Sequence, residues 1–328
     1  MSIRKISEAL GLSTTTVSWI LSGQGEKRGF KKETIERVYE YARTIDYRPN
    51  LIARNLSNGF TNTIGLIVPF INDTFYANLI QATEAQAKQR SLFLTVCSTE
   101  GSEDRETELI NTLLGQRVDG IMLISTKESD KNIKLLQKKD HPFVLIIRHF
   151  RKIDTNNITV DFMKCSYELT KGLIERGAKQ IAVITSNSQI CEIQQRVHGY
   201  NTALQEAGLR CDDDLCANIS RINYKEDFDS KFETLLNSNP EIDGFFFVTH
   251  YLALEAFRYF VERKIDFNSK YKFACIYSDM CHKLICPDIA TAELPIEQMS
   301  RKAVELLCKN IKDKAMEKEH IVLEVDIQ

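Results

Sequence analysis

The sequence predicts an α/β fold, with parallel doubly wound sheets, that follows a small helical domain. From residue 63 onward, short apolar runs alternate with segments of helical periodicity, which is typical of parallel sheets covered by helices on both faces. Before residue 60, apolar residues recur every three or four positions in short segments, which predicts a cluster of helices. A chain of 328 residues is long enough for two or three domains.

Residues 3–21 predict two short helices joined by a tight turn. Apolar residues at helical spacing cover residues 3–10, Gly11 ends that helix, and Ser13 can cap the next one. The inward face of the second helix carries Val17, Ile20 and Leu21. Its opposite face carries Thr15, Ser18, Trp19 and Ser22. This is a helix-turn-helix, whose second helix can enter a DNA major groove, or else an ordinary helical hairpin with a solvated polar face.

A third amphipathic helix and a short linker complete the first sixty residues. The helix is expected over residues 31–45, with inward side chains Ile35, Val38, Tyr39, Ala42 and Ile45. Residues 50–57 follow a Pro-Asn pair and predict a helix too short to be stable alone in water. Residues 1–60 carry ten Lys and Arg against six Asp and Glu, a net charge of +4, whereas the rest carries −6. A basic segment on an acidic body is typical of a polyanion-binding module attached to another domain.

The remaining residues predict an ordered series of strands and helices. Strands are expected at residues 64–69, 92–97, 119–125, 143–148, 157–161, 181–185, 244–249 and 272–277. Helices are expected at about 74–90, 103–116, 161–176, 196–207, 225–238, 250–263 and 295–312. So many strands exceed one typical sheet, so two sheets are expected. The second begins after the helix end and glycine turn in residues 175–185.

Composition and motifs argue against several classes of protein. No run approaches the ~18 apolar residues of a membrane span, and residues 3–8 are too polar for a secretion signal. The nine cysteines contain no CxxC pair, which fits free thiols in a reducing cytoplasm better than a metal site. GxGxxG, GxxxxGK[ST], GxSxG and HExxH motifs are all absent. We therefore expect a cytoplasmic protein that is not an enzyme and that binds no cofactor or metal.

The chain resembles the LacI/GalR family of bacterial transcription regulators over nearly its whole length. The residues that carry the resemblance are Ser13 with Thr16-Val17-Ser18, Tyr47-Arg48-Pro49-Asn50, Ala53-Arg54-Asn55-Leu56, Ile64 to Pro69, Val118-Asp119-Gly120, Asp161, and Arg196 with Gly199-Tyr200. The resemblance implies a helix-turn-helix domain over residues 1–46, a hinge helix over 47–60 and a two-lobed core like periplasmic binding proteins over 61–328. The first lobe is expected at about 61–160 plus 291–315. The second is expected at about 161–290 plus the C-terminal strand.

The resemblance also implies residues that contact DNA. Positions matching Thr14, Thr15 and Trp19 read bases, and those matching Thr16 and Ser18 contact the backbone. From the sequence itself, Lys27 and Arg28 lie in a long turn from which they can reach phosphates. The hinge residues are Asn50, Ile52, Ala53, Arg54 and Leu56. In the family, the leucine matching Leu56 wedges into a central minor-groove step, and the alternative for this segment is a plain linker helix.

Trp19 departs from the family pattern, because many members carry Arg at this position. An indole has one N–H donor and no charge, so it cannot recognise guanine with two hydrogen bonds. Trp19 is expected either to contact a thymine methyl group or to pack against the third helix.

A ligand site is expected where the strands end, because ligands of parallel α/β sheets bind beyond the carboxyl ends of the strands. The candidate residues are Phe70, Asp73, Phe75, Tyr76, Ser125, Arg148, Arg196, Tyr224, His250 and Asp279. Aromatic rings beside arginine suit a carbohydrate. Ile147 and Thr249-His250 replace acidic residues that are common in the family, which leaves an anionic or partly apolar ligand open. Arg196 matches a ligand-binding position of the family, and its alternative is a structural salt bridge to Glu192.

The resemblance implies a homodimeric regulator, expected to be a repressor, that binds a palindromic operator in double-stranded DNA. A small-molecule effector, first of all a carbohydrate or its derivative, changes the affinity by closing the two lobes. The sequence leaves two alternatives open. The chain could be a sugar-binding or receptor module without a DNA role, or a regulator that senses a protein partner.

Overall fold

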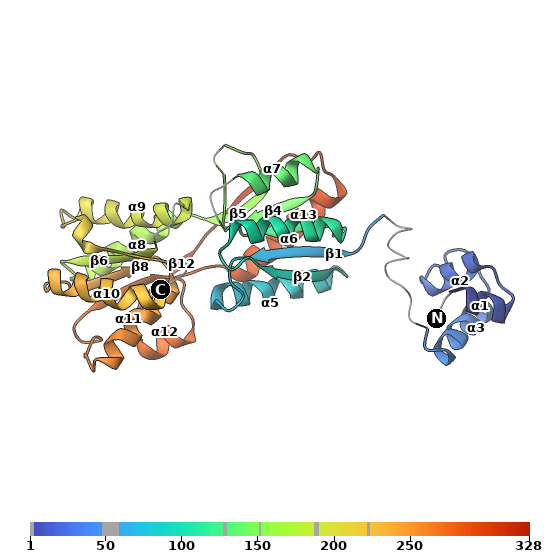
Figure 1. Ribbon diagram of the computed structural model, residues 1–328, viewed down its shortest axis with the longest axis horizontal. Coiled ribbons are helices and arrows are strands. Elements are labelled where there is room, and N and C mark those ends of the chain that lie inside the picture. The colour runs from blue at the N-terminus through green and yellow to red at the C-terminus, as the bar shows by residue number, and fades with distance from the viewer. Residues whose placement is uncertain (1–2, 48–58, 127–129, 151, 187–189, 222–223) are drawn as a thin grey trace. The chain divides into compact units, whose positions relative to one another are not determined.

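The computed structural model describes residues 3–47, 59–126, 130–150, 152–186, 190–221 and 224–328. The chain divides into two compact units, Met1–Asn62 and Thr63–Gln328 (Figure 1). The first unit is helical, and the second contains two six-stranded sheets. Within the described residues, no helix combines the length and the apolar character needed to cross a membrane.

The N-terminal unit contains α1 (Ile3–Leu10), α2 (Thr14–Leu21) and α3 (Lys32–Thr44). Gly11 adopts a φ of 65° between α1 and α2, a conformation that glycine reaches without a steric penalty. The predicted cap is confirmed, because the Thr16 N–H donates to Ser13 Oγ at 3.0 Å. The buried apolar core consists of Ile6, Val17, Ile20, Val38 and Ala42.

Tyr39 was expected to face this core, but its ring is more than one-third exposed. Its hydroxyl donates to the Ile20 carbonyl oxygen at 2.8 Å. A phenol keeps its oxygen at the surface while its ring covers apolar atoms, so Tyr39 fastens α3 to the end of α2 from outside the core.

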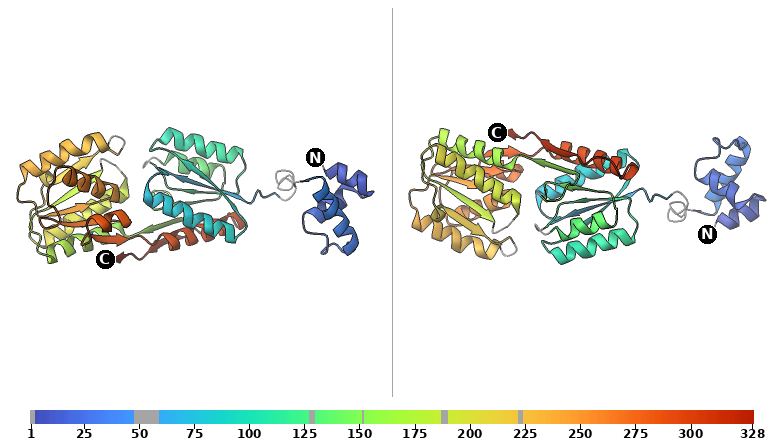
Figure 2. Two further views of the ribbon diagram at one scale, coloured as in Figure 1. Left: turned by 90° about the horizontal axis from the view of Figure 1, so that it is seen from below. Right: turned by 90° about the horizontal axis from the view of Figure 1, so that it is seen from above.

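The second unit contains two mostly parallel sheets, each covered by helices on both faces (Figure 2). The first sheet has the order β11 (His320–Leu323), β5 (Asn157–Val160), β4 (Phe143–Ile146), β3 (Gly120–Leu123), β1 (Thr63–Val68) and β2 (Phe93–Ser98). Its helices are α5 (Thr74–Gln89) and α13 (Ile296–Lys312) on one face, and α6 (Glu103–Gly115) and α7 (Lys131–Lys138) on the other.

The second sheet repeats this arrangement. Its order is β12 (Asp326–Ile327), β10 (Ala290–Glu293), β9 (Lys272–Ile276), β8 (Gly244–Phe247), β6 (Ile181–Ser186) and β7 (Cys216–Ile219). Its helices are α8 (Phe162–Glu175) and α9 (Cys191–Glu206) on one face, and α10 (Tyr224–Ser238), α11 (His250–Glu262) and α12 (Met280–Ile285) on the other. The sequence-based expectation of two parallel α/β sheets is therefore confirmed, although β7, β10, α7 and α12 were missed.

The C-terminal strand corrects one expectation. It was placed in the second lobe as a whole, but it is split between the two sheets. β11 pairs in parallel with β5 of the first sheet, and β12 pairs antiparallel with β10 of the second. β11 covers the edge of β5 that would otherwise expose unpaired backbone groups. The chain passes between the lobes three times, before α8, before α13 and between β11 and β12.

Gly199 permits the close packing of α9 on α8. A Cβ at this position would lie 2.1 Å from the Met163 carbonyl oxygen, so no other residue fits without a backbone shift. α9 begins at Cys191, five residues before the expected position. Arg196 therefore lies in the second turn of this helix and not at its start.

Candidate functional site

The two sheets face a shared cleft with a volume of about 360 Å³. Residues that line it follow the carboxyl ends of strands from both sheets, as expected for a ligand site of parallel strands. The expected residues that line the cleft are Phe70, Asp73, Phe75, Tyr76, Arg148, Arg196 and His250. The structure thus brings together seven of the ten side chains that the sequence singled out.

Asp73 forms an ion-pair network between the lobes. It caps α5 by accepting from the Phe75 N–H, while its other contacts come from the second lobe. Arg221 Nη2 lies 2.9 Å from Asp73 Oδ2, and His250 Nε2 lies 3.2 Å from Oδ1. Burial acts to raise the pKa of Asp73, but the contacts with His250 and Arg221 outweigh burial and hold that pKa below its usual value.

Aromatic rings surround the Arg221 guanidinium. It lies 3.8 Å from the Tyr251 ring centroid and 4.4 Å from that of Phe70. Phe70 follows β1 of the first sheet, whereas Tyr251 lies on α11 of the second lobe. Cation–π contacts on rings from both lobes therefore add to the ion pair with Asp73.

A second ion pair between the lobes is formed by Arg148, which lines the cleft, and Glu192, which does not. Arg148 Nη1 donates to Glu192 Oε2 at 2.9 Å, and the His149 backbone N–H donates to Oε1 at 3.1 Å. Arg148 Nε also donates to the Ser125 carbonyl oxygen. Burial acts to raise the pKa of Glu192, but the His149 side chain, whose Nδ1 lies 3.3 Å from Oε1, and the charge of Arg148 lower that pKa to about 2.

Arg196 is buried and has unused donor capacity. Its Nη1 donates to the Val248 carbonyl oxygen at 2.7 Å, and the guanidinium carbon lies 4.0 Å from the Phe162 ring centroid. Burial and the charge of Arg148 lower the pKa of Arg196 to about 10, so it stays charged at neutral pH. Its Nε has no hydrogen-bond partner among the described residues. A ligand acceptor at this point would satisfy a donor that is costly to leave unpaired.

The alternative partner of Arg196 was Glu192, but the structure pairs that carboxylate with Arg148 and His149. Of Arg148 and Arg196, it is Arg148, on the opposite lobe from Glu192, that forms the ion pair with the Glu192 carboxylate.

Three of the expected residues do not line the cleft. Ser125 donates its hydroxyl to buried Glu106 at 3.1 Å. Asp279 caps α12 and accepts from the Cys281 N–H. Tyr224 packs edge-on against Tyr251, with ring centroids 5.0 Å apart, behind the residues that line the cleft. Local contacts direct the polar atoms of Ser125 and Asp279 away from a ligand.

The cleft residues that the sequence did not single out include Arg221, Tyr251 and Tyr277. Arg221 follows β7, a strand that the sequence pattern did not predict. Had β7 been predicted, Arg221 would have been a candidate because it follows the carboxyl end of a strand. Tyr277 ends the expected segment 272–277, and its hydroxyl accepts from Asn78 Nδ2 at 2.7 Å. Tyr277 and Ile147 have φ of 66° and 67° after equivalent strands of the two sheets. Side chains adopt this region at a cost of about 1–3 kcal/mol, and such residues cluster at functional sites.

The outer face of α2 is polar and accessible. Thr14, Thr15 and Ser18 are exposed, whereas the Thr16 hydroxyl lies 2.8 Å from Ser13 Oγ and takes part in the cap. Trp19 is half-buried, 6.2 Å from the Phe30 ring, with the Arg28 guanidinium carbon 3.8 Å above it. Trp19 therefore packs against the turn before α3.

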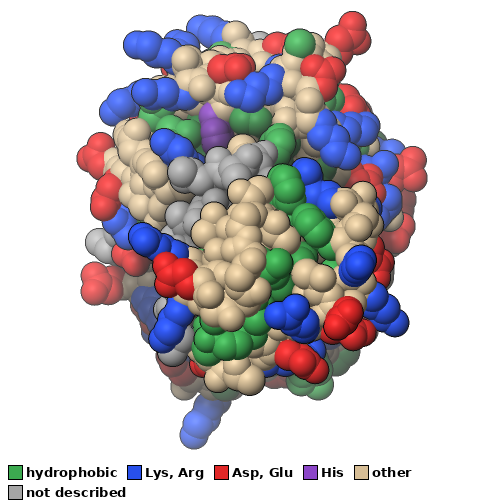
Figure 3. Space-filling model, turned by 90° about the vertical axis from the view of Figure 1, so that its right-hand side faces the viewer, with side chains coloured by type: hydrophobic (Ala, Val, Ile, Leu, Met, Phe, Trp, Pro, Cys, Tyr) green, Lys and Arg blue, Asp and Glu red, His purple; other side chains and the backbone are tan. Residues whose placement is uncertain are grey.

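The turn between α2 and α3 adds charged side chains to this surface. Lys27 is exposed, and Arg28 Nε donates to Gln24 Oε1 at 3.2 Å. On the face shown in Figure 3, both Lys and Arg side chains and Asp and Glu side chains are exposed. The hinge residues Asn50, Ile52, Ala53, Arg54 and Leu56 lie outside the described residues.

The described residues offer no metal-binding arrangement. No group of three or more His, Cys, Asp or Glu side chains is placed to hold an ion among them. All nine cysteines are free thiols.

Known proteins with a similar sequence or structure include several transcription regulators. Residues 61–322 match the family model of periplasmic binding proteins and the sugar binding domain of the LacI family. The HTH-type transcriptional regulator RegA of Clostridium saccharobutylicum is 25% identical over 327 residues, which cover 99% of this chain and 97% of that protein. The Lac repressor bound to ONPG in its repressed state superimposes with a TM-score of 0.86 at 16% identity, covering 100% and 98% of the two chains. The complex of the transcriptional regulator CelR with cellobiose superimposes with a TM-score of 0.74 at 22% identity, with the same coverage.

Proposed function

Because this chain belongs to the LacI/GalR family of transcription regulators, we propose that it binds an operator in DNA and responds to a small molecule in the cleft. The observation that carries the proposal is the pairing of two features in one chain. One is an accessible polar face on α2, and the other is a cleft lined from both lobes with an unsatisfied buried arginine donor.

The DNA-binding domain in this proposal is the helix-turn-helix of residues 1–46. Thr14, Thr15 and Trp19 face the bases from α2, while Thr16 and Ser18 contact the backbone. One α2 covers only a half-site, so a homodimer that binds a palindrome is the natural assembly.

Phosphate contacts and the hinge extend this interface. Lys27 and Arg28 approach phosphates from the turn, and Arg28 also holds the Trp19 ring in place. Residues 47–60 form the hinge, in which Leu56 wedges into the minor groove with support from Asn50, Ile52, Ala53 and Arg54.

The effector in this proposal is a carbohydrate or carbohydrate derivative. Cellobiose and ONPG are the ligands named for the two solved relatives, and aromatic rings beside arginines suit a polar ring. Among the described residues, the cleft is lined by three arginines and one carboxylate, that of Asp73, which already binds Arg221 and His250. This balance favours a derivative with a negatively charged group. Arg196 is the residue that such a group meets.

Switching follows from differential affinity. A ligand that contacts both lobes stabilises the closed core, and it changes DNA affinity only as far as it binds the two states unequally. The hinge links the core to the DNA-binding domain, so closure changes the pairing of hinge helices in the dimer.

Selection of bound fragments from random duplex DNA tests the DNA half of the proposal. We expect a symmetric site of about 14–20 bp, two half-sites one or two helical turns across. Thermal unfolding with a panel of sugars and sugar phosphates then tests the effector half. A protein that selects no sequence but is stabilised by a sugar would be a binding module without a DNA role. Operator selection without any response to the panel would favour a protein partner as the signal.

A further inference from the structure

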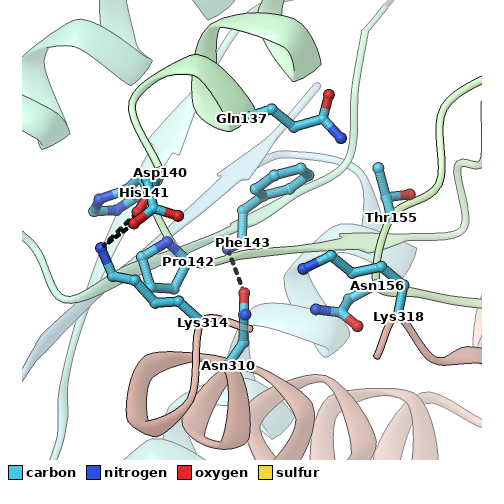
Figure 4. A pocket seen from close by; sticks show the side chains of 10 residues that line it. All are labelled: Gln137, Asp140, His141, Pro142, Phe143, Thr155, Asn156, Asn310, Lys314 and Lys318. Atoms are coloured by element: carbon cyan, nitrogen blue, oxygen red, sulfur yellow. Dashed lines mark hydrogen bonds and ion pairs between the residues drawn. The ribbon is translucent and has the colours of Figure 1, made fainter. Parts of the chain in front are cut away.

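A second cavity lies at the opposite end of the first sheet from the cleft. It has a volume of about 170 Å³ and opens where β4 and β5 begin and where α13 ends (Figure 4). The strands of this sheet are parallel, so the cavity and the cleft are separated by the length of the strands. The cavity belongs to neither the proposed effector site nor the DNA-binding face of α2.

Two buried side chains that line this cavity each carry one polar atom without a hydrogen-bond partner among the described residues. Thr155 and Asn156 are each only 1% exposed. Neither Thr155 Oγ1 nor Asn156 Nδ2 has a hydrogen-bond partner among the described residues. The orientation of the Asn156 amide is fixed, because its Oδ1 accepts from the Glu319 N–H at 3.0 Å. A backbone N–H can only donate, so the unpaired atom of Asn156 is its NH₂ donor.

A histidine adds a third unpaired atom. His141 lines the cavity, and its buried Nε2 also has no partner among the described residues. Burial and the charge of Lys314 lower the pKa of His141 to about 4, so its ring is neutral at pH 7 and one ring nitrogen donates. Unpaired buried polar atoms are rare because each costs free energy, so the unpaired atoms of Thr155 and Asn156, on one side of the cavity, point to a missing partner there.

The charges around the cavity favour an anion. Lys314 contacts the Asp140 carboxylate at 3.1 Å, whereas no ion pair is found for Lys318 within the described part of the chain. Two lysines against one aspartate leave one positive charge in excess. In Figure 4, Lys318, Asn156 and Thr155 lie on one side of the cavity, and Asp140, His141 and Lys314 lie on the other.

We propose that this cavity binds a small oxyanion, a phosphate or carboxylate group, through Lys318, Asn156 and Thr155. Ammonium and amide groups can only donate, and a hydroxyl can also donate, so the partner they share must be rich in acceptors. The cavity is well below the usual volume of about 300–1,000 Å³ for larger ligands, so it admits such a group or a metabolite of similar size. The Asp140 carboxylate is held by Lys314 at the opposite side and does not occupy the place of the anion.

The test is a titration of the full-length protein with inorganic phosphate at constant ionic strength. Binding is measured by calorimetry, and stabilisation is measured by thermal unfolding. Sulfate and acetate test whether the cavity binds other oxyanions as well. Sodium chloride is the control for screening of charges by salt. We expect saturable binding of phosphate and a rise in Tm that chloride does not reproduce. Sugar phosphates, added separately, show whether the anion is recognised alone or as part of a metabolite.

Two variants localise the site. Lys318→Ala should weaken phosphate binding by about tenfold, as expected for the loss of a charge-assisted hydrogen bond. Thr155→Val keeps the shape and removes an unpaired hydroxyl, so it should weaken binding while the Tm without phosphate stays equal or rises. Lys312→Ala, which removes an exposed lysine of α13 that does not line the cavity, should bind phosphate as the wild type does.

Three results would overturn the proposal. These are a Tm rise equal to that in chloride, wild-type affinity in both Lys318→Ala and Thr155→Val, or loss of binding in Arg196→Ala with both cavity variants unaffected. The last result would move the phosphate to the cleft.

Discussion

Glu192 offers the sharpest test of how the core is held together. Its side chain is 2% exposed, and it joins the lobes by accepting from Arg148 and His149. The pKa of Glu192 lies at about 2 against an ordinary value of 4.5. Lowering the pKa from 4.5 to about 2 on folding corresponds to roughly 3 kcal/mol of unfolding free energy at pH 7. Glu192→Gln keeps the shape but removes this contribution, and breaking a buried ion pair on one side has a similar typical cost.

The pH dependence separates this mechanism from a packing defect. Because the pKa is lowered in the folded state, the contribution is complete above about pH 4.5 and is lost as the pH falls towards 2. Urea unfolding monitored by far-UV circular dichroism should therefore show a deficit of about 3 kcal/mol at pH 7 that shrinks to roughly half that value at pH 3. Glu262→Gln, which removes an exposed partner of Arg258, should cost less than about 1 kcal/mol. A deficit for Glu192→Gln that does not change with pH would refute the reasoning.

Three further predictions concern the two proposed sites. Thr15→Ala should weaken binding to the selected operator by about tenfold but leave binding to a scrambled duplex unchanged at the same salt concentration. If Thr15→Ala and the wild type bind the operator with equal affinity, Thr15 does not contact a base. Arg196→Lys keeps a charge but loses the unpaired Nε, so calorimetry should show at least about tenfold weaker effector binding, and wild-type affinity would exclude a ligand role. Asp73→Asn retains the cap of α5 and should lower the unfolding free energy by about 1–3 kcal/mol, less than for a fully buried pair because Arg221 stays partly hydrated; unchanged stability would mean that the ion pair between the lobes contributes nothing.

The alternation of strands and helices could be predicted because it follows from the local spacing of apolar residues. Each buried strand is a short apolar run, and each covering helix has an apolar stripe. β7 and β10 escaped this pattern because their segments, CANI and ATAE, are short and partly polar. The split of the C-terminal segment also escaped it. Which sheet edge accepts β11 or β12 depends on residues far away in the chain, and no local pattern records it.

The cleft shows the same division between local and distant information. Phe70, Asp73 and Arg148 could be predicted because their places after strands follow from the order of elements. Whether a side chain at such a place faces a ligand depends on its neighbours, as the hydrogen bond of Ser125 to Glu106 shows. The partners Asp73 and Arg221 are 148 residues apart. Contacts of this kind arise only when the two lobes meet.

The fluorescence of Trp19 can report on the N-terminal unit without an added label. It is the single tryptophan of the chain, and it lies on α2 beneath the Arg28 guanidinium. Light absorbed selectively by indole therefore reports on the N-terminal unit alone, while the far-ultraviolet signal comes mostly from the helices of the larger unit. Emission that changes when DNA draws Arg28 towards a phosphate, and emission that stays constant when a ligand enters the cleft, would allow both events to be followed in one unlabelled sample.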